Sequence, residues 1–103
     1  MSIAKKKIGK KVMIRTYSAG VHFGTLNDVE KNEGFYDVEL VDARRIFSWT
    51  GAFTLSELAV KGSTRTDSKI SIQIPSIFLE AIEIIEMTDE GYKNLMNIEP
   101  HKI

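Results

Sequence analysis

The residues best suited to bind a ligand lie between Ala43 and Ala52, where two arginines stand close to aromatic residues. The guanidinium groups of Arg44 and Arg45 can pair with phosphate oxygens, and the indole of Trp49 can stack on a base. The pattern predicts a site for an anionic nucleotide. In an extended strand Arg44 points to the face opposite Arg45 and Trp49, so a single site needs a bulge or bend. The alternative is that the aromatic residues are core and the arginines pair with carboxylates.

A second cluster, Arg15, Tyr17 and His22, surrounds the turn Ser18-Ala19-Gly20. Backbone N–H groups in such a turn can bind an anion, and these side chains would complete the nucleotide site from a neighbouring strand or subunit. The same residue types are also typical of an ordinary hairpin turn. The predicted ligand-binding set therefore comprises Arg44, Arg45, Trp49, Arg15, Tyr17 and His22.

Catalytic chemistry finds no support in the sequence. There is no cysteine, and the two histidines, His22 and His101, lie outside any zinc-binding spacing. A serine-nucleophile turn and a phosphate-binding glycine loop are also missing. We therefore expect no catalytic residue, no metal and no cofactor, and we expect a binding protein rather than an enzyme.

The composition is that of one small globular domain. The chain has 103 residues, 43% of them hydrophobic, and no net charge. Residues 1–11 form a lysine-rich lead, and residues 12–103 are expected to form a single β-rich domain. The acidic residues concentrate toward the other end of the chain, which favours a homo-oligomer held together by opposite charges. No apolar run is long enough for a membrane helix, so we expect a cytoplasmic protein without membrane contact.

The elements that must position these residues are mainly strands. Five segments have the β-branched content or the two-residue alternation of strands: 12–17, 21–26, 36–49, 70–74 and 77–86. The polar residues 27–34 and 63–68 are expected to be connections. Pro75 is expected to end the fourth strand, because proline cannot donate a hydrogen bond to a sheet.

Two short helices accompany the strands. Thr54-Leu55-Ser56-Glu57 fits a capping box, and Gly62 can end that helix, which is expected at about Leu55 to Lys61. A second helix should begin after Thr88 and stop before Pro100. The predicted fold is a small antiparallel barrel of the SH3-like or Sm-like kind, with one short inserted helix and a short C-terminal helix.

Several motifs between Val12 and Thr88 support a resemblance to known proteins. They are Arg15-Thr16-Tyr17-Ser18-Ala19-Gly20-Val21, Gly24-Thr25-Leu26, Ala43-Arg44-Arg45-Ile46, Trp49, Gly51-Ala52, Leu55-Ser56-Glu57-Leu58-Ala59 and Glu80-Ala81-Ile82-Glu83-Ile84-Ile85. With these motifs the chain resembles a family of small uncharacterised proteins of tailed bacteriophages. The resemblance implies an accessory protein in the cytoplasm of an infected bacterium, but it supplies no established activity.

Three functions remain open at this point. The first is counter-defence, in which the protein binds and sequesters an anionic, nucleotide-derived immune signal. The second is inhibition of a host or defence enzyme by direct protein contact. The third is nucleic-acid binding by a small barrel, against which the absence of net positive charge argues.

Overall fold

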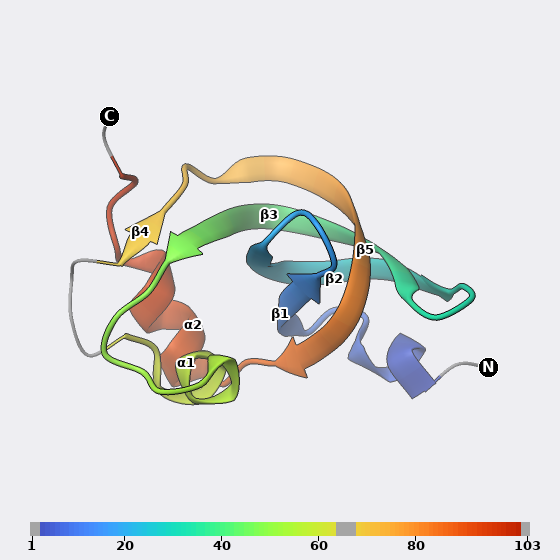
Figure 1. Ribbon diagram of the computed structural model, residues 1–103, viewed down its shortest axis with the longest axis horizontal. Coiled ribbons are helices and arrows are strands. Elements are labelled where there is room, and N and C mark those ends of the chain that lie inside the picture. The colour runs from blue at the N-terminus through green and yellow to red at the C-terminus, as the bar shows by residue number, and fades with distance from the viewer. Residues whose placement is uncertain (1–2, 64–67, 102–103) are drawn as a thin grey trace.

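The computed structural model describes residues 3–63 and 68–101. Figure 1 shows strands that wrap around one another, with two helices at one end of the molecule and the N-terminal segment at the other. The elements are a 3-10 helix η1 (Ile3–Lys7), strands β1 (Lys11–Thr16), β2 (Val21–Lys31) and β3 (Tyr36–Ser48), helix α1 (Leu55–Lys61), strands β4 (Lys69–Ile70) and β5 (Ile74–Glu86), and helix α2 (Asp89–Met96).

The strands form one five-stranded antiparallel sheet in the order β2-β1-β5-β3-β4. Because β2 also pairs with β3, the hydrogen bonds close a ring through β2, β1, β5 and β3. Strand β4 adds to β3 outside this ring. The prediction of a mainly β, small antiparallel barrel with two short helices is therefore confirmed, and one of the helices is C-terminal as expected.

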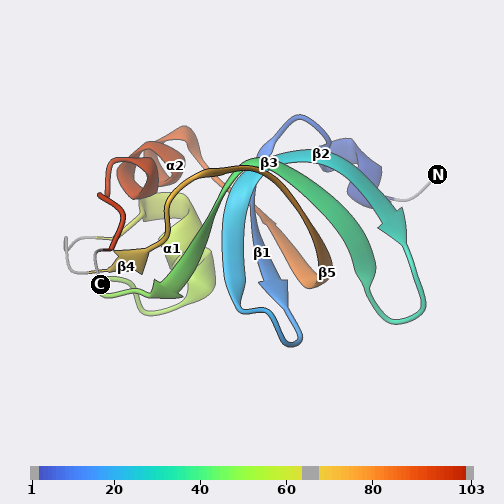
Figure 2. The ribbon, with the colours of Figure 1, turned by 90° about the horizontal axis from the view of Figure 1, so that it is seen from above.

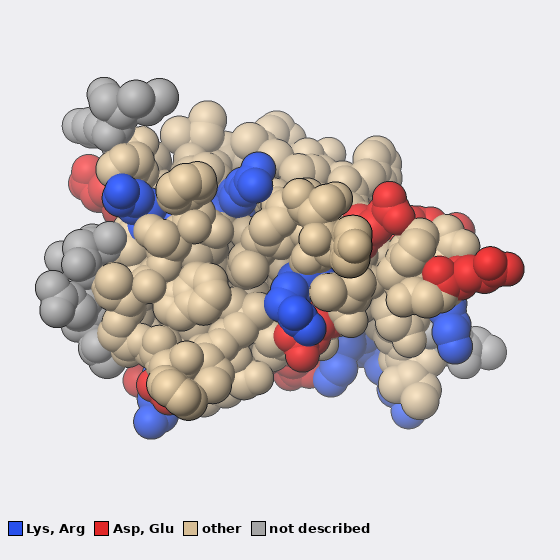
Figure 3. All heavy atoms as spheres, viewed as in Figure 1, with Lys and Arg blue, Asp and Glu red and all other residues tan. Residues whose placement is uncertain are grey.

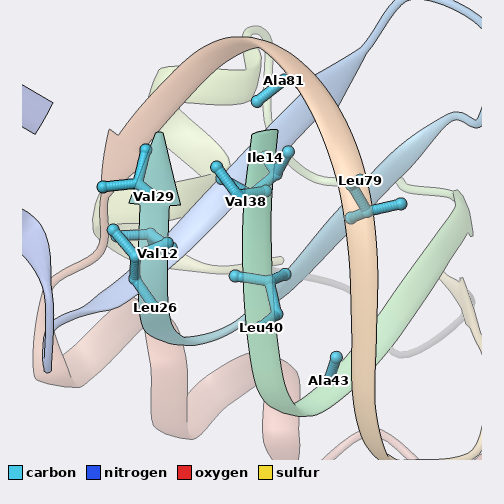
Figure 4. Packing of buried hydrophobic residues seen from close by; sticks show 9 residues of the cluster. All are labelled: Val12, Ile14, Leu26, Val29, Val38, Leu40, Ala43, Leu79 and Ala81. Atoms are coloured by element: carbon cyan, nitrogen blue, oxygen red, sulfur yellow. The ribbon is translucent and has the colours of Figure 1, made fainter. Parts of the chain in front are cut away.

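The ring encloses one hydrophobic core, shown in Figure 4. Its side chains come from alternate positions of the strands, because successive residues of a strand point to opposite faces. Nine buried residues make up this core: Val12, Ile14, Leu26, Val29, Val38, Leu40, Ala43, Leu79 and Ala81. In β3 the alternation that identified the strand in the sequence is therefore the alternation between barrel interior and exterior.

A second core lies between the outer face of the sheet and the two helices. Its strand residues include Met13, Phe23 and Ile46, and its helical residues include Leu58 and Leu95. Figure 2 shows α1 and α2 side by side at the same end of the molecule. The helices thus cover the apolar outer face that the barrel presents at that end.

Both predicted helices begin at their predicted caps. The hydroxyl of Thr54 accepts a hydrogen bond from the backbone N–H of Glu57, and Gly62 ends α1 at φ 76°. The hydroxyl of Thr88 accepts from the backbone N–H of Gly91 at the start of α2. Gly91 also allows the helices to meet, since a Cβ placed there would overlap the carbonyl oxygen of Ala59.

The expectation that Pro75 ends a strand is wrong. β5 begins at Ile74 and continues through Pro75 without interruption. Residues 74–80 pair with β3 on one side only, and proline is tolerated at such an edge because its missing N–H need not face a partner. On the facing strand, Asp42 adopts φ 51°, next to the place where the register between β3 and its other neighbour, β2, shifts.

The expectation that residues 27–34 form a connection is also wrong. β2 continues to Lys31, so only residues 32–35 link it to β3. The two strands continue together as a ribbon whose exposed face carries acidic side chains, while Val29 and Val38 on its other face remain in the barrel core. A strand of this kind lacks the apolar content by which strands are recognised in a sequence.

The lysine-rich lead packs against the barrel rather than extending from it. Gly9 donates a backbone hydrogen bond to Leu26, and Leu26 donates one to Lys10. Residues 64–67 of the predicted polar loop lie outside the described residues. Among the described residues, neither α1 nor α2 nor the 3-10 helix has the length and apolar content needed to span a membrane.

Candidate functional site

A groove of about 910 Å³ opens at one end of the barrel. Two hairpins and the middle of β5 form its walls: residues 16–19 of the β1–β2 hairpin, residues 28–30, 34–35 and 37–39 of the β2–β3 ribbon, and residues 78–80 and 82 of β5. Its floor is apolar, because Val29, Val38 and Leu79 from the barrel core reach it. The groove therefore depends on segments that are far apart in the sequence.

Large apolar side chains at the rim of the groove are open to solvent. Tyr17 is 88% exposed and Phe78 is 78% exposed, and Ile82 is also exposed. Exposed aromatic residues around a concave surface are typical of interaction sites, because they gain most when a partner removes them from water. The groove thus combines an apolar floor with aromatic edges.

The charges around the groove are of one sign. Asp28, Glu30, Asp37, Glu39 and Glu80 border it, and no lysine, arginine or histidine among the described residues does so. These acidic residues alternate with Val29, Val38 and Leu79 along the strands, so their side chains lie on the outer face of the sheet beside the groove and not on its floor. In the strand register Asp28 stands opposite Glu39, Glu30 opposite Asp37, and Asp37 opposite Glu80. Like charges directly across a strand pair are destabilising. Figure 3 shows a group of acidic side chains at the end where the β2–β3 ribbon projects.

Only part of this negative charge is balanced within the chain. The Lys5 ammonium group lies 3.5 Å from a carboxylate oxygen of Asp28 and donates to the Val29 carbonyl oxygen at 2.8 Å. Among residues 3–63 and 68–101, neither Glu30 nor Glu80 makes an ion pair. An ammonium group is thus already held at this rim, while Glu30 and Glu80 have no ion-pair partner in the part of the chain that the structure describes.

Arg44, predicted to bind a ligand, is an internal structural residue that is only 3% exposed. Its Nε donates to the Ser71 carbonyl oxygen at 2.8 Å, and its Nη1 donates to the carbonyl oxygens of Leu95 and Met96 at 3.1 and 3.2 Å. The last two belong to the C-terminal end of α2, where a cation is favoured by the helix dipole. Burial lowers the pKa of the Arg44 guanidinium group. Its Nη2 is buried, and none of the residues that the structure describes provides a hydrogen-bond partner for it.

Arg45 points to the opposite face, as the alternation of a strand predicts, and is exposed. Its guanidinium group lies against the β1–β2 hairpin, since a Cβ placed on Gly20 would be 3.2 Å from Nη2. Arg45 is also the cross-strand neighbour of His22. The two residues therefore lie together near the base of this hairpin.

His22 is 4% exposed, and its Nε2 donates to the Ala19 carbonyl oxygen at 2.9 Å. Burial lowers the pKa of His22, the hydrogen bond to Ala19 raises it, and the charge of Arg45 lowers it further. The ring is therefore held in its neutral form and fixes the hairpin. Because of this hydrogen bond to the backbone, Nε2 of His22 is not available to a ligand.

The remaining predicted residues lie apart. Arg15 pairs with Glu83 at 3.2 Å on the surface. Trp49 is half-buried against the core under the helices. Tyr17 alone of the six predicted residues lines the groove. The structure therefore brings Arg45, His22 and the hairpin together, but it separates them from Arg44 and Trp49.

Sequence reasoning missed the acidic residues and Phe78. The signal of the acidic residues was present as two short alternations, Asp28 with Glu30 in a stretch interpreted as a connection and Asp37 with Glu39 in a predicted strand. Within the described part of the chain, no three His, Asp or Glu side chains are grouped so that they could hold a metal ion. The arrangement that remains is a groove suited to binding.

Comparison with known proteins gives a family without a function. A family model described as a domain of unknown function, DUF6948, matches residues 9–95. No curated protein and no solved structure matches the chain. The matched region begins before β1 and ends within α2, so it includes the complete ring of strands and the groove. The chain therefore belongs to the DUF6948 family of domains of unknown function.

Proposed function

We propose that this protein is a non-catalytic binding domain whose groove takes a cationic, partly apolar segment of a partner protein. One observation carries the proposal: a groove with exposed aromatic edges is bordered by five acidic residues, whose side chains lie on the adjoining outer face of the sheet, and by no basic residue among those described. This is the protein-partner alternative of the sequence analysis, with a surface and a charge assigned to it.

The sign of the charge favours a cationic ligand over an anionic one in this groove. Two unit charges 4 Å apart interact by about 1 kcal/mol in water and about 4 kcal/mol near a protein surface. A phosphate would be repelled by several carboxylates, whereas an ammonium or guanidinium group would be attracted by the same groups. Lys5 illustrates the attraction, because its ammonium group is bound at the rim by a carboxylate and a carbonyl oxygen.

The shape favours a chain segment over a small molecule. At about 910 Å³ the groove is at the upper end of the size of small-molecule sites, which lie at roughly 300–1,000 Å³. Its aromatic edges are open, unlike a pocket that encloses its ligand. Aromatic residues such as Tyr17 and Phe78 commonly dominate the energy of protein contacts.

The resemblance to tailed-phage proteins suggests where such binding would act. We place it in the cytoplasm of an infected bacterium, where an accessory protein would occupy a basic segment of a host or defence enzyme. The partner would then be inhibited by occlusion, without chemistry on the part of this domain.

A second candidate keeps the predicted nucleotide-sequestering function but reduces its site. It rests on Arg45, which is exposed beside the hairpin turn and forms no ion pair within the described residues. Arg44 and Arg15 are engaged elsewhere, so a phosphate would be held by Arg45 and the hairpin backbone. Such a ligand would lie outside the acidic part of the groove.

Calorimetry with charged peptides tests the first candidate. The probes are the capped peptides Lys-Ile-Lys-Ile-Lys and Glu-Ile-Glu-Ile-Glu, titrated at low and at high salt. We expect saturable binding of the lysine peptide that weakens with salt, and no binding of the glutamate peptide. The same protein titrated with cyclic and ADP-ribose-derived nucleotides tests the second candidate.

Matched variants locate the binding. Phe78→Ser removes an aromatic edge of the groove, and Phe53→Ser removes one that is 91% exposed and outside it. We expect only Phe78→Ser to weaken the lysine peptide, by roughly tenfold for a contact of about 1.4 kcal/mol. Equal affinity in both variants, or a lysine peptide that does not bind, would contradict the proposal.

A further inference from the structure

The strand β5 changes partners in its middle. Residues 74–81 pair with β3, and residues 81–86 pair with β1, so that Ala81 faces both Tyr36 and Thr16. In the described part of the chain, no strand consequently pairs with the edge of β5 that faces away from β3 between Ile74 and Glu80. In Figure 1 this half of β5 arches over β3 along the outside of the molecule. Within the described residues, no loop or helix forms a backbone hydrogen bond to this edge.

This open edge runs along the groove. Phe78, Leu79 and Glu80 line the groove, and the β1–β2 hairpin at residues 16–19 forms another wall. Unpaired backbone groups on an edge are a template for an extended chain. Pro75 blocks only the beginning of the edge, because it has no N–H to offer. Residues 76–80 therefore remain available for pairing.

We infer that the partner segment binds as an additional strand on the open edge of β5 at residues 76–80; this inference rests on the proposed function. The added strand places Lys or Arg beside Glu80 and an apolar residue beside Phe78. The occupant is thus a segment of another protein with the pattern cation, any residue, apolar residue. Main-chain hydrogen bonds fix its position, and the two flanking side chains give the selectivity.

The pattern follows from the strand register. Glu39 faces Phe78 and Asp37 faces Glu80, so these side chains share the outer face of the sheet. Side chains alternate along a strand, and directly opposed residues on adjacent strands are in contact. An added strand therefore places two residues of the outer face, two positions apart, next to Phe78 and Glu80. The residue between them faces the side of Leu79.

The charge selects the cation at one of these positions. Glu30, Asp37 and Glu80 form a row of three carboxylates across neighbouring strands, and Glu80 stands at the open end of this row. A Lys or Arg of the added strand would lie next to the last carboxylate of this row. Its positive charge would offset the repulsion among the three carboxylates. An apolar side chain beside Phe78 covers an aromatic ring that is otherwise exposed.

Backbone methylation of a peptide tests the strand directly. The probe is capped Ser-Lys-Thr-Ile-Ser, with one version N-methylated at Lys and Ile and another N-methylated at Thr. Because alternate residues of an added strand donate to the edge, one methylated version should lose at least tenfold in affinity and the other should not. Amide hydrogen exchange in residues 76–80 should slow when the unmodified peptide binds.

A charge exchange tests the register. Glu80→Lys should lose the lysine probe and gain the version with Glu in its place, whereas Glu99→Lys, on an exposed residue outside the groove, should behave as the unmodified protein. Sedimentation during the titration shows whether a second copy of the chain takes the edge instead, and a dimer displaced by the probe would overturn the assignment to another protein.

The outcomes separate this inference from the proposed function. Equal binding of both methylated versions, with no slowing of exchange in residues 76–80, would overturn strand addition while leaving a cation-binding groove. Failure of both the Lys-Ile-Lys-Ile-Lys peptide and the Ser-Lys-Thr-Ile-Ser peptide to bind would overturn the proposed function, and strand addition with it.

Discussion

Replacing Arg44 by methionine should destabilise the fold strongly, whereas the same replacement of Arg45 should not. The two residues are adjacent in β3 and chemically identical, but Arg44 is buried and Arg45 is exposed. Methionine is similar in length and apolar, so each substitution removes the charge and the hydrogen bonds while leaving most of the side-chain volume. The pair therefore compares a structural arginine with a surface arginine.

The hydrogen bonds of Arg44 give the size of the effect. It donates to the carbonyl oxygens of Ser71, Leu95 and Met96, and so joins β3 to the segment after β4 and to the end of α2. Breaking the contacts of a buried charge typically costs about 3–5 kcal/mol of folding stability. We expect a cost of about 3 kcal/mol, because the methionine variant no longer has to remove a guanidinium group from water when it folds. A loss of about 3 kcal/mol is a large share of the roughly 5–15 kcal/mol that stabilises a domain. It corresponds to a decrease in Tm of roughly 12–24 °C.

Urea unfolding followed by circular dichroism measures both variants against the unmodified protein. We expect Arg44→Met to lower the unfolding midpoint greatly with an unchanged slope, and Arg45→Met to stay within about 0.5 kcal/mol, as surface substitutions usually do. If Arg44→Met is as stable as Arg45→Met, the internal role of Arg44 is refuted, and its assignment to a ligand site regains weight.

Substitutions at three further positions test other parts of the fold. The lowered pKa of His22 means that the unfolded chain binds a proton more readily, so stability should fall as the pH decreases below about 6.5; in urea unfolding at pH 7.5 and 5.5, His22→Gln should lose part of this dependence. Gly91→Ala should separate α1 from α2 and lower the Tm by several degrees in a thermal scan, because its methyl group overlaps Ala59; unchanged stability would contradict the close packing. Thr54→Ala should cost about 1 kcal/mol in urea unfolding, while Thr54→Ser should not.

The sequence was a good guide where one local pattern controls the structure. Val38 and Leu40, which alternate with acidic residues in the sequence, face the barrel core, and Thr54 and Thr88 cap the helices that follow them. These features depend on contacts between near neighbours. Pro75 was misinterpreted because its position at an edge depends on which strands pair, and pairing between distant segments is not visible in local sequence.

The candidate site was less accessible from the sequence for the same reason. The sequence predicted that Arg44 and Arg45 point in opposite directions. It could not predict which of the two is buried, because that depends on which face of the sheet the helices cover. The groove combines the hairpin near Tyr17, the ribbon of β2 and β3, and Phe78 of β5. Only the closed ring brings these segments together.

Chemical-shift mapping of the isotope-labelled protein with Lys-Ile-Lys-Ile-Lys tests the central claim most directly. The proposed function predicts saturable shifts in the amide signals of the groove, at residues 16–19, 28–30 and 78–82, with little change around Trp49. Shifts confined to other surfaces, or no saturable change with this peptide while an ADP-ribose-derived nucleotide shifts the signals of Gly20 and Arg45, would contradict a cation-binding groove.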